Sequence, residues 1–260
     1  MMKFYLYFIL IVYINEIYSL NLNSIKHNCL ITKFGIRQLK ASILIPFLSV
    51  FISYESALSI PEQKSFPNQI QSREYVKVAV ERLKKGEIAE SVLDFDKAIE
   101  LDGNLAPYLW QRGLALYFNE KYDQCSDQFK KDLLVNPKDT EETVWEYICR
   151  SENFPETNQK FMLKQINNDK RPIMRSVYML FNNEITPEEL DNFGSKGDPS
   201  SYFYSRLYLA LYSHTTKNDT KALFYIRDAN KSLYANKYKD LDLMVKVSNL
   251  FETKIKQILN

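Results

Sequence analysis

A segment that nearly repeats itself at a spacing of 34 residues most constrains how this chain can fold. Residues 75–103 align with residues 109–137 without a gap, and the agreement is in residue character more than in identity. The equivalent positions carry small, aromatic or turn residues: Tyr75 and Leu109, Ala79 and Gly113, Ile88 and Tyr122, Ser91 and Cys125, Phe95 and Phe129, Gly103 and Pro137. A repeat of this length is one pair of helices, which must stack on a neighbour to bury its apolar face. The sequence therefore predicts an all-α stack of helix pairs.

Each copy of the repeat divides into two predicted helices. In the first copy, a helix from Arg73 ends at Lys84-Lys85-Gly86, where basic residues and a glycine are typical of a helix C-terminus. Its predicted partner covers residues 88–101. The second copy predicts helices over 107–118 and 122–135, and Asn136-Pro137 ends it. A bulky residue at Gly113 is expected to be costly, because the two helices of a pair approach closely there.

Helical patterning continues beyond Pro137, but the 34-residue period weakens. The predicted helices are 139–149, 155–166, one that starts at Thr186, 198–213, 220–233 and 239–259. The acidic clusters at Asp139 and Thr186 have the spacing of helix caps. Residues 198–233 form a third, looser repeat, in which Ala222, Ile226 and Ala229 take the places of Cys125, Phe129 and Asp132. The last helix is expected to cap the stack.

The first 72 residues are predicted to be sorting signals and a linker. Residues 1–19 combine Lys3 with a short apolar run and fit a signal peptide, and residues 20–59 are basic and poor in acids, as transit peptides are. This order is similar to the bipartite leader of proteins sent to a plastid of secondary endosymbiotic type, such as an apicoplast, through the secretory pathway. A secreted or endomembrane location is the alternative. Residues 60–72 are predicted as a linker, and residues 73–260 as the folded domain.

A second apolar run, residues 42–54, leaves three explanations open. It could be a lumen-type sorting signal, an anchor kept in the mature protein and associated with a membrane, or part of a long transit segment. Thirteen residues span only about 20 Å as a helix, less than the ~30 Å hydrocarbon core of a bilayer.

Composition and motifs disfavour several classes of function. Of 34 basic and 32 acidic residues, five basic and two acidic ones fall in residues 1–59, so the predicted domain is close to neutral and no nucleic-acid surface is expected. No glycine-rich phosphate loop is present, and no cofactor is expected. The three cysteines predict neither a metal site nor a disulfide framework. Cys125 is interpreted as core filler, and a thiol–imidazole dyad of Cys149 and His214 is disfavoured because neither lies in a nucleophile motif.

The segments FDKAIELDGN, LWQRGLALY and NPKDTEETVWEYI, within residues 95–152, carry a resemblance to known proteins. They are similar to the central part of tetratricopeptide-repeat (TPR) proteins of plant plastids and of bacterial NlpI-type lipoproteins. The resemblance implies a TPR-like α-α superhelix of about three repeats with capping helices. It also implies an adaptor role, and a homodimer is consistent with it. Cys29 lacks the lipobox of the lipoproteins, so lipid anchoring is not implied.

In the TPR register, the inner face of the first helix of each pair should line a groove that binds a helix or extended peptide. The candidate groove residues are Lys77, Val80, Trp110, Gln111, Leu114 and Tyr117. They are mainly apolar, so binding of a chaperone's C-terminal carboxylate is not expected. Burial of Trp110 and Tyr117 against the chain's own C-terminal helices is the alternative. The repeat-signature residues are Ala79, Phe95, Gly113, Cys125, Phe129 and Pro137.

The sequence thus predicts a non-catalytic TPR adaptor or assembly scaffold that binds protein partners in a plastid-like organelle. No group of convergent titratable residues indicates an enzyme. The alternative is a membrane-tethered structural subunit of an import or assembly complex, which requires that residues 42–54 be retained.

Overall fold

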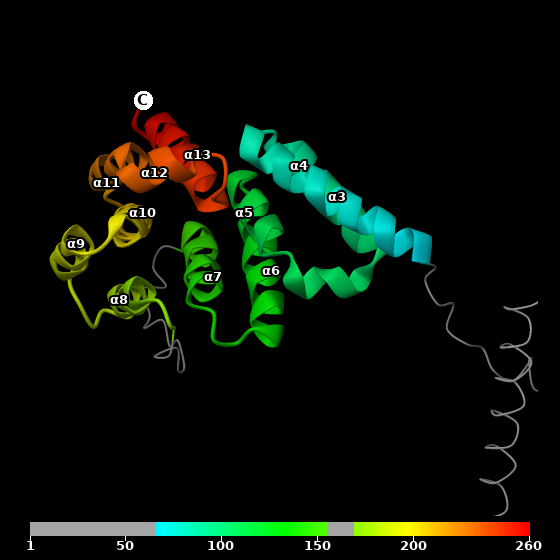
Figure 1. The fold of residues 1–260 in the computed structure, drawn as a ribbon, viewed down its shortest axis with the longest axis horizontal. Helices are drawn as coiled ribbons and strands as arrows, with labels where there is room; N and C mark the ends of the chain where they lie inside the picture. The colour runs from blue at the N-terminus through cyan, green and yellow to red at the C-terminus, as the bar shows by residue number, and fades with distance from the viewer. Residues whose placement is uncertain (1–65, 155–168) are drawn as a thin grey trace, which may run out of the picture. The chain divides into compact units, whose positions relative to one another are not determined.

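The computed structural model describes residues 66–154 and 169–260, and this part of the chain is helical, with no β-strand (Figure 1). It belongs to one compact unit, Gln63–Asn260. The predicted all-α class is therefore confirmed. The predicted leader, the apolar run 42–54 and the predicted helix 155–166 lie outside the described residues.

The first helix pair consists of α3 (Phe66–Lys85) and α4 (Ile88–Leu101), which pack closely on each other. Helix α3 begins inside the segment predicted as linker, so that prediction is wrong from Phe66 onward. Pro67 lies in the first turn of α3, where a proline removes no helical hydrogen bond. Gly86 adopts φ +82° in the turn between the helices, as predicted for a left-handed stop.

The second pair consists of α5 (Trp110–Phe118) and α6 (Tyr122–Val135). The helix predicted over 107–118 is shorter than expected, because Gly103–Tyr108 forms the separate 3₁₀ helix η1. Asp102 starts η1 by accepting a hydrogen bond from the Asn104 backbone N–H at 3.1 Å. A 3₁₀ segment is common as a connector between helices.

The two pairs make the same contacts at equivalent positions. The Ser91 hydroxyl donates to the Ala79 carbonyl at 2.8 Å, and the Cys125 Sγ lies 3.2 Å from the Gly113 carbonyl oxygen. Phe95 and Phe129 are both buried in the shared core. A Cβ added to Gly113 would lie 2.6 Å from the Phe129 ring, so only a glycine permits this approach of α5 and α6. Pro137 is exposed after α6.

The next helices are α7 (Thr140–Asn153), α8 (Pro172–Phe181) and α9 (Pro187–Lys196). The predicted caps are confirmed. Asp139 accepts from the Glu142 backbone N–H, and Thr186 forms a complete capping box with Glu189. Each of these helices packs on the next in chain order, and α9 packs on α10.

The C-terminal part contains α10 (Pro199–Thr215), α11 (Asp219–Lys231), α12 (Leu233–Tyr238) and α13 (Leu243–Leu259). Helices α10 and α11 form a closely packed pair, as predicted for residues 198–233. Their core includes Ala222, Ile226 and Ala229, which are fully buried.

Helix α13 does more than cap the preceding pair. It packs on α11 and also contacts α5 and α3, so the last helix of the chain lies beside helices of the first two pairs (Figure 1). Val247, Phe251 and Ile255 on its inner side are fully buried. Leu250 approaches the Gly86 turn, and the Lys254 ammonium donates to the Tyr122 hydroxyl at 2.8 Å. Helix α13, which was expected only to cap the stack, therefore also packs against the first two helix pairs.

Cys125 of α6 and Cys149 of α7 form a disulfide, which the sequence analysis did not predict. Their Cα atoms are 5.8 Å apart, a separation typical of a disulfide. Cys125 is fully buried in the core, as its interpretation as core filler requires, but its bond to Cys149 was not predicted. The pairing was missed because 24 residues separate the two cysteines, and only the packing of α6 on α7 brings them together.

No helix among the described residues is long and apolar enough to cross a membrane.

Replacing Gly113 by leucine should destabilise the fold, because the side chain would overlap the Phe129 ring. We expect a loss on the order of 1–3 kcal/mol in the free energy of unfolding, measured by urea denaturation. Gly103→Ala is the matched control, since a Cβ there meets no atom within 4 Å. Equal stability of Gly113→Leu and the parent chain would contradict the close helix approach.

Removing the disulfide should also lower stability. For a loop of this length, the Cys125→Ala/Cys149→Ala double variant should lose about 3 kcal/mol relative to the oxidised protein. Dithiothreitol should lower the melting temperature of the parent chain and leave that of the double variant unchanged. Peptide mapping without reductant, if it recovered Cys125 and Cys149 only as free thiols, would show that the bond does not form.

Candidate functional site

A small cavity lies where α5, α6, α7 and α13 meet, and we call it the tryptophan pocket. It is lined by Trp110, Phe129, Asp139, Glu141, Glu142, Trp145 and Met244. Both tryptophans of the chain belong to it. Its volume of about 210 Å³ is below the roughly 300–1,000 Å³ of typical small-molecule sites. The cavity is thus suited to one side chain rather than to a large cofactor.

The acidic wall of the pocket comes from the first turn of α7. Asp139 caps this helix through its hydrogen bond of 3.0 Å from the Glu142 backbone N–H, and it also accepts from the Asn136 side chain. Glu141 and Glu142 follow in the first turn, where the helix dipole favours carboxylates. The capping sequence thereby places three carboxylates at one edge of an aromatic cavity.

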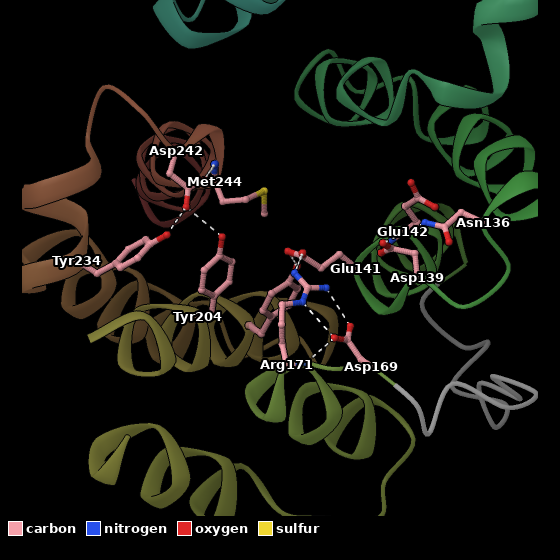
Figure 2. Close-up of polar contacts among 11 residues, drawn as sticks. Asn136, Asp139, Glu141, Glu142, Asp169, Arg171, Tyr204, Tyr234, Asp242 and Met244 are labelled. Atoms are coloured by element: carbon pink, nitrogen blue, oxygen red, sulfur yellow. Dashed lines mark hydrogen bonds and ion pairs between the residues drawn. The ribbon is translucent and has the colours of Figure 1, made fainter. Parts of the chain in front are cut away.

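Glu141 is fully engaged with neighbouring side chains (Figure 2). Its carboxylate pairs with the Arg171 guanidinium at 2.5 Å and accepts from the Tyr208 hydroxyl at 2.9 Å. Arg171 also pairs with Asp169 at 2.9 Å. Burial raises the pKa of Glu141, and the charge and hydrogen bond of Arg171 act against this rise.

Glu142 has no such partner. Its Oε2 is buried without a hydrogen bond, and no ion pair to Glu142 occurs among residues 66–154 and 169–260. Burial, followed by the charges of Asp139, Asp132 and Glu141, raises the pKa of Glu142 to about 8. The Nε1–H of Trp145 likewise lacks an acceptor, although this side chain is only 2% exposed. The pocket therefore contains an unsatisfied acceptor and an unsatisfied donor.

The opposite wall is the start of α13. Asp242 caps this helix by accepting from the Met244 backbone N–H at 2.8 Å. The same residue accepts from the hydroxyls of Tyr204 at 3.0 Å and Tyr234 at 2.7 Å. Figure 2 shows Met244 and Glu141 extending toward one another from α13 and α7. Two tyrosines from α10 and α12 thus hold the start of α13 in place.

The predicted groove residues divide into three groups. Trp110 is half-buried and lines the pocket, and the adjacent Gln111 is half-buried with an unpaired Oε1. Lys77 is exposed and Val80 half-buried on α3, outside the pocket lining. Leu114 and Tyr117 have no exposed surface, so they offer nothing to a partner in this structure.

Tyr117 is buried against the chain's own C-terminal region. Its ring lies 5.3 Å from the Lys254 ammonium of α13, and its hydroxyl donates to Glu152 at 2.7 Å. This is the alternative that the sequence analysis left open for Tyr117. Helix α13 thus occupies part of the groove predicted for a partner.

A second polar cluster surrounds the buried His214 of α10. Its Nε2 lies 3.0 Å from Glu152 Oε1, and its Nδ1 lies 2.5 Å from Asp219 Oδ1. Burial alone would raise the pKa of Glu152, but the hydrogen bond and charge of His214, then Tyr117 and Lys254, lower it to about 2. Burial would lower the pKa of His214, but Glu152 and Asp219 raise it.

This cluster joins five helices, α5, α7, α10, α11 and α13, and its polar atoms face one another. His214 is engaged by two carboxylates, and Cys149 is bonded to Cys125. The two residues therefore do not form the thiol–imidazole dyad considered from the sequence. No group of three or more His, Cys, Asp or Glu side chains in the described part of the chain could hold a metal ion.

Sequence reasoning missed Glu142, Trp145 and Met244 as pocket residues. The capping pattern explained Glu142 without reference to a ligand, and Trp145 fitted the apolar stripe of α7. Met244 lies far along the chain, and only the return of α13 to α5 brings it to Trp110. The one local signal for this pocket in the sequence was the acidic pair Glu141 and Glu142, which lies close to Trp145 on the same predicted helix.

No protein-family model matches this chain, and no curated protein matches it significantly.

The His214 cluster should make stability depend on pH in a defined window. Glu152 contributes stability above its usual pKa of 4.5, and this contribution is lost as pH falls toward 2. His214 contributes fully below its usual pKa of 6.5, and its contribution is lost as pH rises through its elevated pKa. The stability deficit of His214→Gln should therefore be largest between about pH 4.5 and 6.5 and shrink at higher pH. Urea denaturation at pH 5, 7 and 9 measures this difference, and a deficit that grows with pH would contradict it.

Proposed function

We propose that this chain is a non-catalytic, TPR-like scaffold that binds a protein partner through the tryptophan pocket. The repeated contacts of the first two helix pairs support a TPR-like arrangement. Ser91 and Cys125 approach the carbonyls of Ala79 and Gly113 in the same way, 34 residues apart. The resemblance of residues 95–152 to TPR adaptors supports the same function.

The pocket itself is the observation that carries the proposal. Helix α13 covers Tyr117 and the end of α5 near it, whereas Trp110 at the start of α5 keeps exposed surface. A partner therefore finds its anchor point at Trp110, beside a cavity with aromatic and acidic walls. Aromatic residues in pockets of this kind contribute strongly to protein interfaces.

The disulfide bears on where the scaffold acts. Buried disulfides persist in compartments more oxidising than the cytosol. The bond between Cys125 and Cys149 therefore favours entry into the secretory pathway, which is also what the predicted signal peptide requires. We propose this route for the chain, with a plastid of secondary endosymbiotic type as the destination.

Trp110→Ala should abolish partner binding without unfolding the chain, because the side chain is half-buried at the pocket edge. The measurement is affinity purification from the native organism with quantitative mass spectrometry, with circular dichroism as the check of folding. Tyr108→Ala is the matched control, since Tyr108 is an exposed aromatic residue outside the pocket lining. A set of captured proteins that is identical for the parent chain and both variants would contradict the proposal.

A further inference from the structure

We propose that the tryptophan pocket binds a positively charged side chain, a lysine or arginine of the partner protein. This inference rests on the proposed scaffold function and specifies the chemistry that the pocket recognises. It depends on three features of the pocket: its excess of carboxyl groups over cations, its aromatic walls and its unpaired polar atoms.

The charge around the pocket is negative after its internal pairs are counted. Arg171 is engaged by Glu141 and Asp169. Arg112, whose charge acts on Asp132, forms an ion pair with Asp96 and donates a hydrogen bond to the Gln128 side chain. No cation of the described chain pairs with Glu142 or Asp139. Electrostatic complementarity therefore favours a partner group that carries positive charge.

The aromatic walls add to this preference. The faces of tryptophan rings attract cations more strongly than those of other aromatic side chains. In the described residues, lysine and arginine groups lie over tyrosine rings such as Tyr117 and Tyr225, and over neither indole. Trp110, which keeps exposed surface, is thus available for a cation from outside, and Met244 and Phe129 can contact the methylene groups of its side chain.

The two unpaired atoms of the pocket, one acceptor and one donor, can both be satisfied by a cationic residue of a peptide, through its charged group and its backbone carbonyl. The Glu142 Oε2 acceptor can receive an N–H of an ammonium or guanidinium group. The buried Nε1–H of Trp145 lacks an acceptor, and a carbonyl oxygen of the partner that enters the pocket would supply one. Leaving such buried groups unpaired is unfavourable, so a ligand that satisfies both is favoured.

Proton linkage gives the proposal a further signature. The groups that act on the Glu142 carboxyl are Asp139 and Glu141 beside it at the start of α7 and Asp132 on α6. Lys131 of α6 and Arg112 of α5 act in turn on Asp132, and Arg171 before α8 acts on Glu141. Burial, followed by the charges of these carboxylates, raises the pKa of Glu142 to about 8, so this carboxyl is largely protonated at neutral pH. A bound cation favours the ionised form, so binding should release a proton and strengthen as pH rises from 6 to 9.

The test is a fluorescence titration, because both tryptophans of the chain line the pocket and their emission reports on it directly. The probes are the N-acetyl methylamides of lysine, arginine and norleucine. Norleucine has an apolar side chain of similar length and no charge. We expect saturable emission changes with lysine and arginine, and binding of norleucine about tenfold weaker.

Glu142→Gln should weaken binding of the lysine probe about tenfold, remove its pH dependence and leave norleucine binding unchanged. Glu142 is not the cap of α7, so the variant should fold. Glu90→Gln, at an exposed position of α4, is the matched control and should bind as the parent chain does. Equal affinity for norleucine and lysine, or unchanged lysine binding in Glu142→Gln, would overturn the proposal.

The outcome also separates this inference from the scaffold function. If Trp110→Ala loses the partner but the pocket prefers norleucine, the scaffold stands and the partner presents an apolar side chain. If the pocket selects lysine but Trp110→Ala retains every partner, the cation site stands and the proposed binding surface is wrong.

Discussion

The close approach of paired helices is the constraint on which the rest of the structure depends. At Gly113 the helix α5 comes so near α6 that the Phe129 ring occupies the space of a side chain. This contact sets the position of Trp110 on one helix relative to Phe129 on the other, and both line the pocket. The disulfide then joins α6 to α7 and so relates the acidic first turn of α7 to the same pair.

Helix α13 occupies part of the position where the repeat predicts a groove for a partner. This helix partly covers the first helix pairs, through Leu250 at the Gly86 turn and Lys254 over the rings of Tyr117 and Tyr122. Tyr117 consequently belongs to the interior, where its hydroxyl joins the charged cluster of Glu152 and His214. Trp110 keeps exposed surface at the edge of the tryptophan pocket, and α13 supplies one wall of this pocket through Met244.

Burial has different consequences for the two groups of titratable residues. Around His214, opposite charges and hydrogen bonds outweigh desolvation, so Glu152 stays ionised and His214 holds its proton more tightly. At Glu142, desolvation and like charges act together, and the carboxyl holds its proton to about pH 8. The first arrangement is internally satisfied and stabilises the fold. The second is unsatisfied, as functional sites often are.

Local sequence determined most of the helices and many of their ends, although α8 and α12 were not predicted. The caps at Asp139 and Thr186 and the stop at Gly86 each depend on neighbours within one or two turns, so they could be predicted. The 34-residue repeat predicted the first two helix pairs. The early start of α3 was missed because Pro67 was taken as part of a linker. The tertiary structure alone decided the Cys125–Cys149 bond, the burial of Tyr117 and the meeting of Met244 with Trp110. These features join residues far apart in the chain, and such contacts follow from how whole helices pack, which no short-range pattern encodes.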